Sequence, residues 1–177
     1  MIIETLTHNG KDIQIVLDES AEDPRKEWDH LGTFFGFHRN YMSPDAPPHA
    51  DPQEARHIAE SAANICIPVW LYDHSGTAYR AAESNPFHCP WDSGLFGFIY
   101  VSKAKARNVY GVKRLTAATV AKVREALESE VAEYSAWANG EVYGWKLLDR
   151  DGEEIDACYG YYGDVDRAKQ DACEAAE

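Results

Sequence analysis

Residues 69–101 read VWLYDHSGTAYRAAESNPFHCPWDSGLFGFIYV, in which two apolar runs flank a stretch dense in turn-forming and polar residues. The runs at 69–72 and 95–101 are rich in β-formers and predict strands, and the residues between them predict a loop. Loops held between buried strands commonly carry binding and catalytic side chains. We therefore expect the functional site in this loop, with Asp73 close to Asp92 because sequential strands are usually neighbours.

The rest of the chain alternates strand and helix patterns. Asn-Gly and Asp-Gly turns predict hairpins over residues 2–17 and 141–161. Residues 33–37 favour a buried strand, and the proline-rich residues 41–52 predict a surface loop. Helical signals cover four segments, residues 52–64, 103–109, 116–138 and 164–176. This order predicts one α+β domain over residues 1–177, with an antiparallel or mixed sheet, N-terminal and C-terminal hairpins, and about three main helices packed on the sheet.

The net charge of −13 is unevenly distributed. Residues 1–60 carry −7, residues 61–115 carry +3 and residues 116–177 carry −9. An acidic surface argues against binding to bulk nucleic acid, because phosphate contacts need Lys and Arg. It is compatible with a partner protein that has a basic surface, or with a solvated face that only aids solubility.

Neither terminus shows a basic region followed by an apolar one, and no apolar run approaches about 18 residues. We therefore expect a cytoplasmic protein that does not enter a membrane. The four cysteines are widely spaced without a CxxC pair, which favours reduced thiols over disulfides.

Several strings resemble a family of small proteins from phages and mobile elements. They are HLGT at residues 30–33, HR at 38–39, YDHSG at 72–76 and PFHCPWDSG at 86–94, within a resemblance that spans roughly residues 28–163. The sequence has Asp29-His30 where this family usually carries Asp-Asn. The resemblance implies a mobile-element protein that works in the cytoplasm of a host cell, and it implies no particular chemistry.

The central loop offers three interpretations. A divalent metal would use imidazole, thiolate and carboxylate ligands, for which the candidates are His74, His88, Cys89 and Asp92. A nucleophilic mechanism would use Ser75, Ser93 or Cys89 with a histidine base and an aspartate that orients it, and the catalytic candidates overall are His38, Asp73, His74, Ser75 and Asp92. Alternatively, these Asp and Ser side chains only cap backbone amides in turns.

Two functions follow from these patterns. The first is an acidic accessory protein without a cofactor that binds and inhibits a host protein, in the manner of a counter-defence protein that mimics nucleic-acid charge. Its contact residues would be the carboxylates of Glu125, Glu128, Glu133, Glu141, Asp149 and Asp151. The alternative is a small hydrolase, with or without a divalent metal, whose site lies in residues 73–94.

Overall fold

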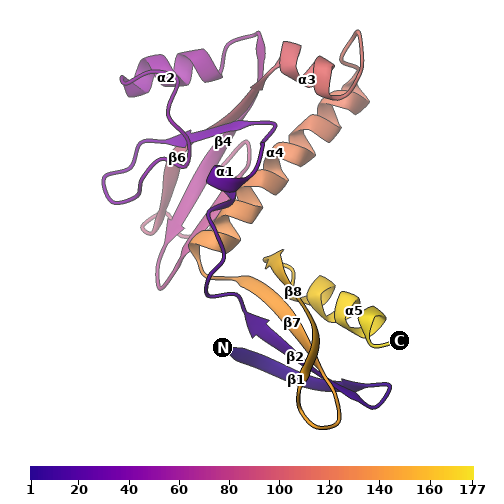
Figure 1. The fold of residues 1–177 in the computed structure, drawn as a ribbon. Coiled ribbons are helices and arrows are strands. Elements are labelled where there is room, and N and C mark those ends of the chain that lie inside the picture. Colours follow the sequence, from indigo (N-terminus) through magenta and orange to yellow (C-terminus); the bar gives the residue numbers. More distant parts are fainter. The chain divides into compact units, whose positions relative to one another are not determined.

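The computed structural model describes residues 1–177 and divides them into two compact units. Unit 1 comprises Met1–Asp23 and Ala136–Glu177, and therefore contains both ends of the chain (Figure 1). Unit 2 comprises Pro24–Ser135. The prediction of an α+β fold is confirmed, since each unit combines an antiparallel four-stranded sheet with helices.

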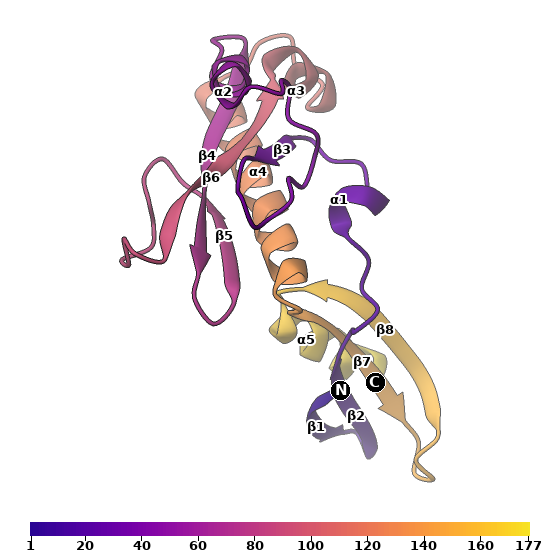
Figure 2. The same cartoon turned by 90° about the vertical axis from the view of Figure 1, so that its left-hand side faces the viewer.

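Unit 2 contains the central stretch, residues 69–101. Its antiparallel sheet, seen in Figure 2, consists in spatial order of β3 (Thr33–Gly36), β6 (Ser93–Ser102), β4 (Asn64–Asp73) and β5 (Thr77–Ala81). Its helices are α1 (Pro24–Glu27), α2 (Pro52–Ala59), α3 (Lys103–Val109) and α4 (Ala117–Ala138), of which α4 continues into unit 1 for its last three residues.

Alternate side chains of β3 point to opposite faces of the unit 2 sheet, and each face has a cover. The Phe34 ring meets Tyr134 of α4 edge-on, with 5.4 Å between ring centroids. Phe35 packs on the other face with Phe98 and with Ala55 of α2. The sheet therefore lies between α4 and α2, and its core is formed by buried aromatic and aliphatic side chains from both faces.

Unit 1 is formed by the two ends of the chain. Its antiparallel sheet has, in spatial order, β1 (Ile2–His8), β2 (Lys11–Leu17), β7 (Val142–Leu148) and β8 (Glu154–Tyr162), and α5 (Val165–Ala175) packs on one face (Figure 1). Ile13 and Trp145 of the sheet are buried against Ala168 and Ala172 of α5. The small alanine side chains let this helix approach the larger side chains of the sheet closely.

Both predicted hairpins are present. Asn9 and Gly10 have φ of +49° and +76°, as the two central residues of a tight hairpin turn require. Gly152, with φ of +82°, lies in the turn between β7 and β8. Local turn chemistry therefore identified these four strands correctly.

The three longest helices, α2, α4 and α5, agree with the expectation of about three main helices, and α1 and α3 are shorter. Three details differ from the sequence expectations. The strands form two sheets instead of one, because β2 pairs with β7 and completes a separate sheet in unit 1. The predicted central loop contains a strand, β5, of which only Tyr79 is buried, so it lacks a clear apolar pattern. Helix α2 stops at Ala59 because the Asn64 side chain donates to the carbonyl oxygen of Ile58 (2.9 Å), and β4 starts at Asn64.

None of the five helices combines the length and the apolar character that a membrane crossing requires.

Candidate functional site

Pairing of β4 with β6 brings the two predicted loops together. Tyr72 lies opposite Ser93 in the register, and the Asp73 amide donates to the carbonyl oxygen of Asp92 at 2.8 Å. The prediction that Asp73 and Asp92 are neighbours is therefore confirmed. Residues 73–76 form the turn between β4 and β5, in which Ser75 adopts a positive φ of 60°.

A third segment, residues 36–43, joins the same end of the unit 2 sheet. The Phe37 amide continues the strand pairing by donating to the Phe96 carbonyl oxygen at 3.1 Å. The Tyr41 hydroxyl donates to the Asp73 carboxylate at 2.8 Å, and this hydrogen bond raises the pKa of Tyr41. The His38 ring lies 5.1 Å from the Tyr41 ring, between centroids.

These three segments enclose a surface cleft of about 280 Å³, which we call the motif cleft. Its lining includes His38, Arg39, Asp73, Trp91, Asp92 and Ser93. The Trp91 side chain is 92% exposed, so an aromatic surface stands at the cleft without packing against the core. Three of the four strings, those at residues 38–39, 72–76 and 86–94, therefore contribute residues to one cleft.

The candidate nucleophiles are not arranged as a relay. A nucleophile is activated by an imidazole that lies between it and an orienting carboxylate. Here Asp92 lies in the middle, with its carboxylate 3.1 Å from the Cys89 sulfur and 3.4 Å from His74 Nδ1. The Ser93 hydroxyl donates to the carbonyl oxygen of Cys89 at 2.6 Å and accepts from the Asn85 amide at 2.9 Å. Ser93 thus ties the turn together, as the capping interpretation expected.

The metal candidates come only partly together. His74 and Cys89 both approach the Asp92 carboxylate, whereas His88 is exposed. No three histidine, cysteine, aspartate or glutamate side chains form a group that could hold a metal ion. Metal binding therefore stays a prediction without a ligand set.

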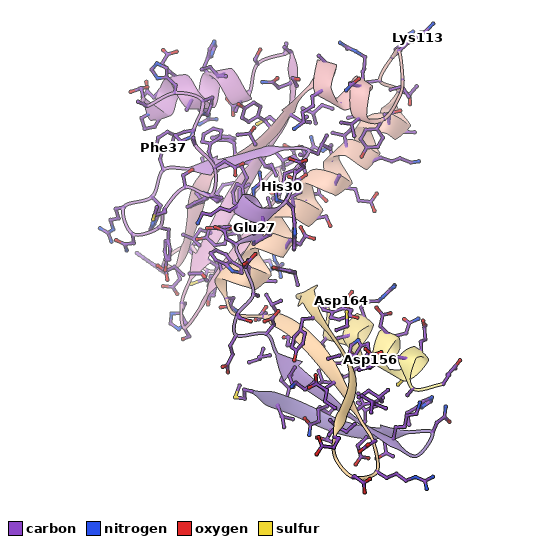
Figure 3. The ribbon with its side chains drawn as sticks, viewed as in Figure 1. Glu27, His30, Phe37, Lys113, Asp156 and Asp164 are labelled. Atoms are coloured by element: carbon purple, nitrogen blue, oxygen red, sulfur yellow. The ribbon has the colours of Figure 1, made fainter.

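Unit 2 also contains a buried ion network that sequence patterns did not indicate. The Arg25 side chain is 1% exposed and pairs with the carboxylates of Asp45 and Glu130, the latter at 2.9 Å. Its guanidinium also donates to the Gly32 carbonyl oxygen at 2.9 Å, and Glu130 accepts from the Leu31 amide at 2.7 Å. This network ties residues 25–45 to α4. His30 lies beside it, with Nδ1 3.8 Å from Glu130 (Figure 3).

The predicted contact carboxylates are divided between the units. On α4, Glu125 and Glu128 are exposed as expected, but Glu133 is half-buried. Burial raises the pKa of Glu133, and its carboxylate is less accessible than those of Glu125 and Glu128. In unit 1, Glu141 and Asp151 are exposed.

Asp149 has a structural role in unit 1, because its carboxylate accepts from the amides of Asp151 and Glu153, each at 2.9 Å. It thereby holds the turn between β7 and β8.

The charge is concentrated in one unit. Unit 1 has 17 acidic and 5 basic side chains, for a net charge of −12, and unit 2 has 13 acidic and 12 basic side chains, for a net charge of −1. Together they give the −13 of the whole chain. Ion pairs of unit 1 include Lys146–Glu154, Arg167–Asp171 and Lys169–Glu4, and its 5 basic side chains cannot neutralise its 17 acidic ones.

Exposed carboxylates of unit 1 include several on the β7–β8 turn, on β8 and on α5. Asp151, Glu153 and Asp156 are exposed and form no ion pair. Figure 3 shows Asp156 on β8 and Asp164 where α5 begins.

Compared with known proteins, the chain matches no protein-family model, no curated protein and no solved structure.

Proposed function

We propose that this protein is a non-enzymatic binding protein that inhibits its partner by covering a basic surface, and that unit 1 makes the contact. The observation that carries this proposal is the net charge of −12 on unit 1 against −1 on unit 2. Complementary charge accelerates encounter and selects among partners. A surface that is acidic over one unit suits a partner with a patch of Lys and Arg.

The partner we propose is a nucleic-acid-binding protein of a host cell. The resemblance to phage and mobile-element proteins favours a host partner, and proteins that contact phosphates expose the Lys and Arg surface that carboxylates would occupy. Binding of this kind would block nucleic acid by competition, without a reaction. It needs no cofactor.

The test compares equal losses of charge in the two units. One variant carries Asp151→Asn, Glu153→Gln and Asp156→Asn in unit 1. Its matched control removes three exposed carboxylates of unit 2, with Glu27→Gln, Glu125→Gln and Glu128→Gln. Each protein is immobilised and used to capture partners from a host lysate at several salt concentrations, after circular dichroism has confirmed folding.

We expect the unit 1 variant to lose captured partner and to respond less to salt, and the control to behave as the unchanged protein. Equal capture by all three proteins would contradict the proposal. Loss only in the control would move the contact to α1 and α4, and α4 carries the predicted contact residues Glu125 and Glu128.

A hydrolase remains a second candidate because the motif cleft gathers His38, Asp73 and Asp92. Since Ser93 is engaged in the turn and Cys89 bonds to Asp92, the mechanism consistent with this geometry is activation of water by His38 or Asp73. A panel of chromogenic ester and phosphate substrates tests it. Turnover that is lost in Asp73→Asn, with folding unchanged, would support the hydrolase; no turnover of any substrate would count against it.

A further inference from the structure

Each sheet ends in two edge strands, and an open edge is a template for another strand. Both edges of the unit 2 sheet are covered. On β3, the Phe34 amide donates to the Asp45 carboxylate at 2.7 Å, and the Phe34 carbonyl oxygen accepts from the Asp45 amide at 2.9 Å. On β5, the Tyr79 amide donates to the Ser135 hydroxyl of α4 at 2.9 Å. Neither strand offers a continuous edge.

In unit 1, β8 is an edge strand that is interrupted. The register with β7 shifts twice, so that Ile155 and Gly160 have no partner residue opposite them. Bulges of this kind twist an edge away from regular pairing. The Asp156 carboxylate also accepts from the Ala157 amide at 2.9 Å and so occupies a donor of the strand.

The remaining edge strand, β1, is regular from Glu4 to His8. The two-residue turn at 9–10 makes His8 and Lys11 a hydrogen-bonded pair, and such pairs alternate along an antiparallel ladder. The amides and carbonyls of Thr5 and Thr7 therefore point away from β2. Both residues are exposed, and no side chain caps their amides.

The side chains of β1 also differ from the rest of unit 1. Ile2 and Ile3 are 53% and 46% exposed. The one acidic residue of the strand, Glu4, is neutralised by Lys169 of α5 at 2.7 Å. This edge thus carries two exposed isoleucines and one paired carboxylate within a unit of net charge −12. A second copy of the chain would bring two such units together, whereas a basic segment would neutralise them.

We propose that β1 receives an extended basic segment of the partner protein as a fifth strand of the unit 1 sheet. Backbone hydrogen bonds to Thr5 and Thr7 hold the segment, its apolar side chains contact Ile2 and Ile3, and its Lys and Arg side chains complement the negative charge of unit 1. Strand addition of this kind takes its affinity from the main chain and its selectivity from alternate side chains. The inference rests on the proposed function of unit 1.

The test uses a capped synthetic peptide of alternating lysine and valine, with a glutamate-valine peptide as the charge control. Binding is measured on the full chain and on two variants of β1. Thr5→Pro removes the outward amide, which proline can do on an edge strand without breaking the pairing to β2. Thr5→Ala keeps the amide and is the matched control. Amide hydrogen exchange of Thr5 and Thr7 is followed by NMR.

We expect the lysine peptide to slow exchange at Thr5 and Thr7 at least tenfold, and to bind Thr5→Pro at least tenfold more weakly than Thr5→Ala. Unchanged exchange at saturating peptide, or equal binding by the two variants, would overturn strand addition and leave the charge-based proposal standing. Equal binding of the glutamate peptide would contradict the charge-based proposal itself. Protection of both amides in a dimer without peptide would identify a second copy as the occupant and overturn the inference.

Discussion

Replacing Arg25 by methionine tests whether the buried ion network holds unit 2 together. Methionine keeps much of the volume of the arginine stem and removes the guanidinium. The change leaves the carboxylates of Asp45 and Glu130 without the cation that both contact. It also leaves the Gly32 carbonyl oxygen without the donor that reaches it at 2.9 Å.

The magnitude follows from how deeply these groups are buried. Removing one partner of a buried ion pair costs about 3–5 kcal/mol, because the charge left behind stays desolvated. The side chains of Asp45 and Glu130 are 21% and 11% exposed, so water partly solvates the carboxylates that remain. We therefore expect the lower end of that range, about 3 kcal/mol. Most of unit 2 should still fold, since its sheet is covered on both faces by apolar side chains.

Hydrogen exchange measured by mass spectrometry is the appropriate assay, because it reports the free energy of opening separately for peptides of each unit. A loss of about 3 kcal/mol corresponds to exchange roughly 150-fold faster in peptides from β3 and β6. Arg56→Met is the control, since Arg56 forms an exposed pair with Glu60 at 3.1 Å. It should cost less than about 1 kcal/mol. Equal effects of Arg25→Met and Arg56→Met would show that the buried network does not stabilise unit 2.

Three further outcomes are expected. Gly97→Ala should unfold or strongly destabilise unit 2, because a Cβ there would meet a backbone oxygen of β3 at 2.0 Å. Gly94→Ala on the same strand is the control, since its Cβ would meet nothing within 4 Å, and urea denaturation compares the stabilities of the two variants. Glu133→Gln should stabilise the protein at pH 7, because burial raises the pKa of the Glu133 carboxyl and so disfavours its charged form in the folded protein. The neutral carboxyl is fully present below the pKa of the unfolded state, and its contribution to stability is lost as the pH rises through the pKa of the folded state. The gain over the unchanged protein should therefore disappear in urea titrations near pH 3. Cys158 should react with iodoacetamide at pH 8 well before Cys66, because Cys158 is exposed while burial raises the pKa of Cys66 to about 12; equal labelling rates would contradict this.

Much of the fold could be predicted from local patterns. Asn-Gly and Asp-Gly identified both hairpins, and α3 lies over the residues that the sequence indicated. The assignment of strands to two sheets could not be predicted in this way, because β2 and β7 are separated by more than a hundred residues and the ladder between them leaves no local signal. Strand β5 was missed because it is short and has a single buried residue, Tyr79.

The site was predicted in its position and less well in its chemistry. Asp73 lies beside Asp92 as expected, although β5 intervenes in the chain, because β4 pairs with β5 on one side and with β6 on the other. The sequence could not predict that Cys89 and His74 both approach the Asp92 carboxylate, because this arrangement depends on side-chain geometry and not on residue spacing. The pairing of Arg25 with Glu130 joins residues 105 positions apart, so no motif indicated it. Total charge was readable from the sequence, but its concentration in unit 1 required the fold.

The salt dependence of association with the captured partner tests the central claim most directly. Association rates are measured from low to physiological salt for the unchanged protein, the unit 1 variant and the unit 2 control. We expect a slower rate and a flatter salt dependence only for the variant with Asp151→Asn, Glu153→Gln and Asp156→Asn, because charge outside the contact steers the encounter far less. Identical rates and salt slopes for all three proteins would contradict it.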